Sequence, residues 1–165
     1  MATFVLVHGG WHGGWCWQKV IPFLEEASHE VYAPTLTGLA ERASELSPDI
    51  GLDTHIQDIV GELLEKNLHG VILVGHSYGG MVITGVVDQM PERIAHLVYF
   101  DTFVPRDGAS MADICSANKH GPTMMDGESI LSAAPTGWRL RQLPTGHDAM
   151  ITLPRELADL LLEVV

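Results

Sequence analysis

Residues 71–81 have the sequence VILVGHSYGGM, in which a G-x-S-x-G motif follows an apolar run and precedes a segment of helical period. The run at 71–74 suits a strand that is covered on both faces of its sheet. The motif predicts a sharp turn from strand to helix, where Gly75 and Gly79 leave room for a strained serine. Such a turn exposes the serine hydroxyl beside a helix N-terminus, so we predict that Ser77 is a nucleophile.

Outward from this turn, short apolar runs alternate with longer segments of helical period. This alternation is typical of βαβ units, and it predicts an α/β fold with a mainly parallel sheet and helices on both faces. The expected strands lie at residues 3–7, 30–33, 71–74, 94–100 and 138–143, and the expected helices at 15–27, 53–67, 81–89 and 154–165. The length of 165 residues fits one domain, residues 1–165.

Composition limits the kinds of partner. The chain has 9 Lys+Arg against 21 Asp+Glu, a formal net charge of −12, which repels nucleic acid and anionic membrane surfaces. Cys16 and Cys115 form no C-x-x-C motif, as expected of reduced thiols. The N-terminus has no signal peptide pattern and no run is long enough to span a membrane, so we expect a cytoplasmic protein.

A nucleophilic serine needs a base and oxyanion donors. His147 lies in the Thr145-Gly146-His147-Asp148 stretch near the C-terminus, where the chain order serine, acid, histidine places the base. The backbone N–H of Tyr78, after the nucleophile, and that of Gly10, in the early glycine loop, are the expected oxyanion donors. Three other histidines are expected to have structural roles: His8, His12 and His76.

Four stretches carry a family resemblance: residues 4–17, 75–81, 99–105 and 146–150. They resemble the plant methylesterase and hydroxynitrile lyase group of the α/β-hydrolases and its bacterial esterase relatives. The resemblance covers residues 3–110 and 137–165, and it implies the roles given above to Ser77, His147, Gly10 and Tyr78. Lyases of this group carry threonine at the position of Gly9 and lysine at that of Asp148, so the resemblance favours ester hydrolysis.

The chain departs from the family in the segment between its fourth and last expected strands. Residues 106–136 are too few for a full cap and for the further strand whose loop usually carries the catalytic Asp, so we expect a compact fold with a reduced cap there. If the strand at 138–143 pairs with the strand at 94–100, Asp101 lies beside His147. The alternatives are Asp126 or Asp113, or a His147 that works without an acid.

These features predict a carboxylesterase that cleaves small esters through an acyl-enzyme. The expected acyl pocket is apolar, and its candidate residues are Trp11, Phe103, Trp138 and Met150, with Met111, Met124 and Met125. No metal or cofactor is expected, because the chain has no H-E-x-x-H motif and its glycine loops do not fit G-x-G-x-x-G. A homodimer is expected, and the alternative function is a non-catalytic protein that binds a small ligand.

Overall fold

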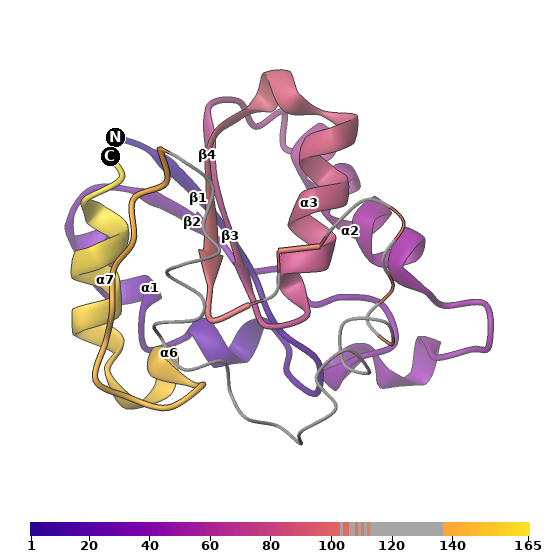
Figure 1. The fold of residues 1–165 in the computed structure, drawn as a ribbon. Helices are drawn as coiled ribbons and strands as arrows, with labels where there is room; N and C mark the ends of the chain where they lie inside the picture. The colour runs from indigo at the N-terminus through magenta and orange to yellow at the C-terminus, as the bar shows by residue number, and fades with distance from the viewer. Residues whose placement is uncertain (103, 106–107, 109, 111, 113–136) are drawn as a thin grey trace.

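The computed structural model describes residues 1–102, 104–105, 108, 110, 112 and 137–165. Within them a four-stranded parallel sheet has the order β2-β1-β3-β4 (Figure 1). The strands are β1 (Thr3–Val7), β2 (Glu30–Tyr32), β3 (Val71–His76) and β4 (Ile94–Phe100). Four of the five expected strands are therefore present, at or close to their expected bounds.

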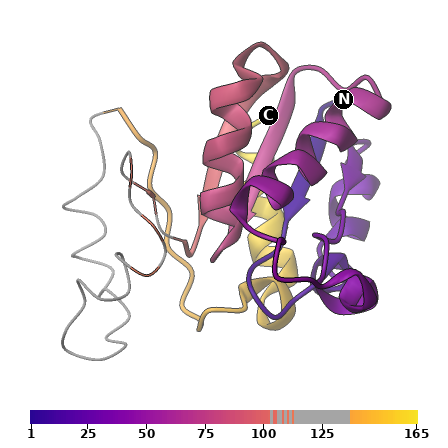
Figure 2. The same ribbon diagram turned by 90° about the vertical axis from the view of Figure 1, so that its right-hand side faces the viewer.

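Helices cover both faces of this sheet (Figures 1 and 2). The α-helices are α1 (Ile21–Glu26), α2 (Leu52–Glu65), α3 (Gly79–Gln89), α6 (Ala149–Thr152) and α7 (Pro154–Leu162). Short 3₁₀ helices occupy η1 (Gly14–Trp17), η2 (Ala40–Glu45) and η3 (Pro91–Arg93). In the described part of the chain, no helix has the length and apolar character needed to cross a bilayer.

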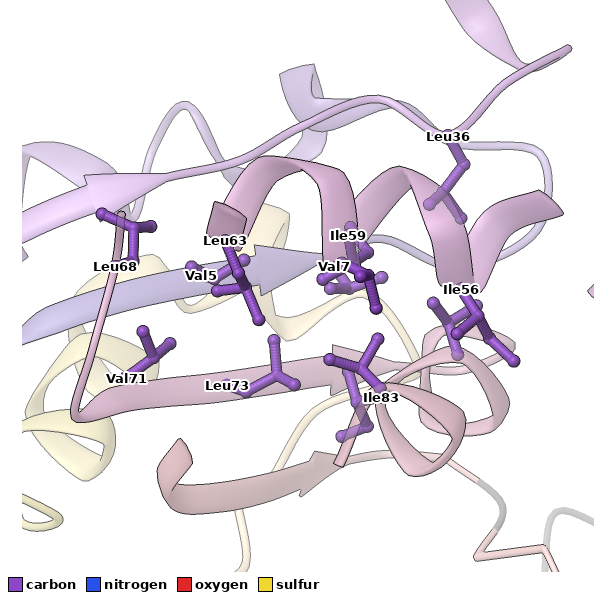
Figure 3. Close-up of a cluster of buried hydrophobic side chains, with 13 residues drawn as sticks. Val5, Val7, Leu36, Ile56, Ile59, Leu63, Leu68, Val71, Leu73 and Ile83 are labelled. Atoms are coloured by element: carbon purple, nitrogen blue, oxygen red, sulfur yellow. The ribbon is translucent and has the colours of Figure 1, made fainter. Parts of the chain in front are cut away.

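The core has two halves because the side chains of a strand alternate between the faces of the sheet. On one face Val5 and Leu73 pack against α2 and α3, where Figure 3 shows Ile59 and Leu63 lying over the strands. On the other face Phe4 packs in a second cluster with residues of η1, α1, α6 and α7. The predicted covering of both faces by helices is confirmed.

The sheet register brings the chain's glycine loops to one edge. Val7 pairs with Gly75, and His76 pairs with Phe100, so β1, β3 and β4 end at neighbouring positions. The chain passes from β1 outward to β2 on one side and from β3 to β4 on the other. The carboxyl ends of β1 and β3 therefore form the switch point at which open α/β sheets bind their ligands.

Two expected helices are divided in the structure. The helix expected at 15–27 is η1 followed by α1, and the break comes before Pro22, which lacks an N–H and suits only the first turn of a helix. The helix expected at 154–165 is α7, which ends at Leu162, and a separate turn, α6, precedes it. Pro154 stands at the first turn of α7 and separates the two.

The strand expected at 138–143 is not formed, so this prediction was wrong. The segment is held by side chains rather than by a ladder of backbone hydrogen bonds. Trp138 stacks on the ring of Tyr99 with centroids 5.3 Å apart, and Arg141 forms an ion pair of 2.7 Å with Glu163 after α7. The reduced cap expected at 106–136 lies almost wholly outside the described residues.

Candidate active site

Ser77 occupies the turn between β3 and α3 with a left-handed backbone, φ +51°. Such a conformation is uncommon for a residue with a Cβ and is found at strained functional turns. A Cβ at Gly75 would lie 2.7 Å from the carbonyl oxygen of Gly79, and a Cβ at Gly79 would lie 2.7 Å from that of Val7. Only glycine fits at these two positions, which explains the G-x-S-x-G spacing in physical terms.

His147 forms a hydrogen bond with Asp101. Its Nδ1 lies 2.6 Å from Oδ2 of Asp101, and the two side chains are 43% and 39% exposed. Asp101 follows β4 directly and has a left-handed backbone, φ +41°. The expected contact is therefore present, although the strand pairing from which it was predicted is not formed.

His76 holds the loop of His147 in place, which agrees with the structural role expected for His76, although this particular contact was not expected. Its Nε2 lies 3.0 Å from the backbone oxygen of His147, and the two rings lie with centroids 4.5 Å apart. Burial, and to a smaller extent the nearby His147, lowers the pKa of His76 to about 4, so this imidazole is neutral near pH 7. The position of His76, directly before the nucleophile at the end of a buried strand, was the available signal.

Two backbone N–H groups near Ser77 are free to bind an anion. In the described chain, the N–H groups of Gly10 and Tyr78 donate to no other group. The glycine loop approaches the nucleophile closely, since a Cβ at Gly9 would lie 2.7 Å from Cβ of Ser77. Tyr78 also directly precedes α3, whose N-terminus favours negative charge. The hydroxyl of Ser77 makes no hydrogen bond to His147 within the described residues; in unliganded sites such bonds are often long.

The loop of Gly10 is fixed by His8. Its Nδ1 donates to the oxygen of Gly9 at 2.8 Å, and its Nε2 accepts from the N–H of Leu36 at 3.0 Å. Both ring nitrogens are therefore used by a neutral imidazole, and burial lowers the pKa of His8 below its usual value. The structural role expected for His8 agrees with these bonds.

His55 fixes the side chain of Tyr78, which the sequence did not indicate. Nε2 of His55 donates to the oxygen of Thr37 at 2.9 Å, so its Nδ1 accepts from the Tyr78 hydroxyl at 2.8 Å. Burial raises the pKa of Tyr78 to about 12, which keeps the phenol protonated as a donor. The side chain of the residue after the nucleophile is thus fixed by a buried histidine.

A model of the alpha/beta hydrolase family matches residues 4–163. The chain belongs to this alpha/beta hydrolase family.

Several named relatives of the chain are esterases. The chain is 52% identical over 111 residues to the carbendazim hydrolyzing esterase of Nocardioides sp., covering 67% of this chain and 46% of that protein. It is 33% identical to methylesterase 2 of Arabidopsis thaliana, covering 86% of this chain and 51% of the relative. An extracellular alpha/beta-hydrolase from a Paenibacillus species has a TM-score of 0.64 at 36% identity, covering 68% and 46% of the two chains. The chain spans about half the length of these relatives.

Of the residues expected to line an acyl pocket, the three that the structure describes are Trp11, Trp138 and Met150, and they do not form one cluster. Met150 is fully buried in the core beneath the sheet, so its expected role in the pocket is not supported. Trp11 is 96% exposed and has a left-handed backbone, φ +68°. Trp138 is 40% exposed and stacks on Tyr99.

Several candidates of the sequence analysis lie outside the described residues. They are Phe103, Met111, Met124 and Met125 of the expected pocket, the alternative acids Asp113 and Asp126, and Cys115.

Proposed function

We propose that this hydrolase is a serine carboxylesterase that cleaves small esters through an acyl-enzyme. The strained backbone of Ser77 carries this conclusion, because it leaves a serine hydroxyl at the switch point of the sheet beside unpaired N–H donors. The hydrogen bond between His147 and Asp101 supplies the second requirement, an oriented base. Relatives named as esterases support the same reaction class.

The first half of the reaction forms a covalent intermediate. Oγ of Ser77 attacks the ester carbonyl while Nε2 of His147 takes its proton. Asp101 accepts the hydrogen bond from Nδ1–H, which leaves the lone pair on Nε2 and stabilises the imidazolium. The N–H groups of Gly10 and Tyr78 bind the oxyanion. His147 then returns the proton to the departing alkoxide, so an alcohol leaves and Ser77 is acylated.

The second half repeats these steps with water as the nucleophile. His147 takes a proton from water, the hydroxide attacks the acyl carbon, and the tetrahedral intermediate collapses to a carboxylic acid and free Ser77. The overall change is ester plus water to acid plus alcohol. Every group needed for both halves comes from the chain itself.

Small esters are the proposed substrates. Because the sequence predicts a reduced cap, we expect little apolar surface for a long acyl chain, so acetate to butyrate esters should be preferred to laurate and palmitate. Relatives are named as methylesterases and as a carbendazim hydrolyzing esterase, and we extend to this chain only the class of small esters.

Hydrolysis of p-nitrophenyl acetate tests this function. The wild-type chain should release p-nitrophenol, and Ser77→Ala should reduce the rate to background while the circular dichroism spectrum is unchanged. Ser44→Ala, on the exposed 3₁₀ helix η2, is the matched control and should keep full activity. A folded wild-type chain without turnover would instead favour the non-catalytic, ligand-binding alternative.

A further inference from the structure

Three side chains from separate segments meet beside the proposed catalytic groups. His12 lies in the loop after β1, His76 ends β3, and Asp148 precedes α6. One nitrogen or oxygen atom from each lies within 4.8 Å of the corresponding atoms of the other two. None of the three takes part in the proposed ester hydrolysis.

The hydrogen bonds of the two rings leave lone pairs in this cluster. Nδ1 of His12 lies 3.0 Å from the oxygen of Gly10, and Nε2 of His76 lies 3.0 Å from the oxygen of His147. A carbonyl oxygen only accepts, so both of these ring nitrogens carry the hydrogen. In a neutral ring the other nitrogen, Nε2 of His12 or Nδ1 of His76, then has the lone pair.

Within the described residues, no hydrogen bond connects these ring nitrogens to the carboxylate of Asp148. His76 is fully buried, and within the described residues its Nδ1 and Oδ1 of Asp148 are buried without a hydrogen-bond partner. Nε2 of His12 lies 3.6 Å from Oδ1 of Asp148, which is longer than an N–H···O hydrogen bond. Buried acceptors of this kind are costly unless a donor or a cation joins them.

We propose that His12, His76 and Asp148 bind a divalent transition-metal ion of the Zn²⁺ type. Nε2 of His12, Oδ1 of Asp148 and the imidazole of His76 would be the ligands, and water would complete the coordination. Two imidazoles and a carboxylate suit such an ion. Histidines that ligate metals also donate their other N–H to a backbone carbonyl or a carboxylate, as both rings do here.

The spacing of the cluster is compatible with this ion after a small contraction. Bonds of about 2.0–2.2 Å in a tetrahedron separate neighbouring ligand atoms by about 3.4 Å. The 3.6 Å between His12 and Asp148 is close to that value. The longest separation, at most 4.8 Å, would have to shorten by a small side-chain movement, and the Asp148 side chain is 42% exposed.

The proposed ion would connect the three segments that carry the catalytic groups. His12 shares its loop with Gly10, His76 directly precedes Ser77, and Asp148 directly follows His147. Binding would therefore hold these segments in register and stabilise the folded chain. No metal was expected from the sequence, because the chain has no H-E-x-x-H motif. The proposed ligands come from three distant segments, which no short motif can reveal.

Zn²⁺ binding to the metal-free full chain tests the site, by isothermal titration calorimetry and by the melting temperature with and without the ion. The wild type should bind one equivalent and melt at a higher temperature when Zn²⁺ is present. Asp148→Asn and His12→Ala should each weaken binding by at least about tenfold, since loss of even an outer-shell partner costs about 10–100-fold. His96→Ala, which removes an exposed imidazole on β4, is the matched control and should bind like the wild type.

Two results would overturn the proposal: no saturable binding by the wild type, or binding by Asp148→Asn and His12→Ala as tight as that of the wild type. Asp148→Asn preserves the shape of the side chain and keeps the test valid if His12→Ala does not fold. Because the assay measures binding and melting, its outcome is independent of whether the chain hydrolyses esters.

Discussion

Asp101→Asn removes the carboxylate that orients His147 and keeps the size of the side chain. The amide loses the negative charge that faces the imidazolium during attack. Its NH₂ group can also donate to Nδ1, which would favour the tautomer that lacks a lone pair on Nε2. Both effects should lower kcat, because each acts on the state in which His147 holds the proton.

The size of the effect follows from the contact and its exposure. With charge centres about 4 Å apart, Coulomb's law gives about 4 kcal/mol at an effective dielectric constant of about 20, and about 1 kcal/mol in water. These values correspond to losses of about 10³-fold and about 5-fold in rate. The 2.6 Å pair is about two-fifths exposed, so we expect an intermediate loss of about 10²-fold. This is smaller than the loss of about 10⁴-fold for the buried carboxylate of a serine protease.

The assay is kcat for p-nitrophenyl acetate, with circular dichroism and the melting temperature as checks of the fold. Asp88→Asn, which neutralises an exposed carboxylate on α3, is the control and should keep the wild-type rate. An Asp101→Asn rate within about threefold of the wild type would refute the reasoning. The role of the acid would then pass to Asp126 or Asp113, or His147 would work without one.

Three further predictions concern packing, pH and assembly. Gly79→Ala should destabilise the fold by about 1–3 kcal/mol in denaturant unfolding, because its Cβ would meet backbone oxygens of Val7 and His8. Gly61→Ala, which has open space around it in α2, should stabilise the fold by about 0.5–1 kcal/mol, and equal effects of the two variants would contradict the packing argument. Because the folded-state pKa of His8 lies below its unfolded value of about 6.5, the free energy of unfolding should fall as the pH drops below about 6.5. This pH dependence should be weaker in His8→Gln, and an unchanged dependence in that variant would contradict the prediction. Light scattering should give a homodimer at micromolar concentration, and a mass of 18.0 kDa would count against it.

Local sequence patterns predicted the parts of the site that depend on neighbouring residues. The turn at Ser77 was predictable because the G-x-S-x-G motif is local, and a Cβ at Gly75 would meet the backbone of Gly79 within it. The limit at Gly79 comes instead from the distant backbone of Val7. The strands were predictable because apolar runs such as β3 are buried on both faces. In contrast, the alternation of apolar and polar residues at 138–143 suggested a strand, but within the described residues this segment pairs with no other strand. It is held instead by the ion pair of Arg141 and the ring stack of Trp138.

Contacts between distant segments were not predictable in the same way. His76 lies next to Ser77 in sequence, yet its bond to the oxygen of His147 depends on how the last segment crosses the sheet edge. Met150 looked suited to an apolar pocket, but α6 turns its side chain into the core. The contact of Asp101 with His147 was anticipated from a pairing of residues 138–143 with β4, but the contact is present without that pairing.

Reaction with a fluorophosphonate probe tests the central claim most directly, because the probe forms a covalent bond only with an activated serine. We expect one adduct per folded chain, located by mass spectrometry on Ser77 in the tryptic peptide of residues 67–93, and no adduct in Ser77→Ala. Absence of labelling in the folded wild type, or labelling that persists in Ser77→Ala, would contradict it.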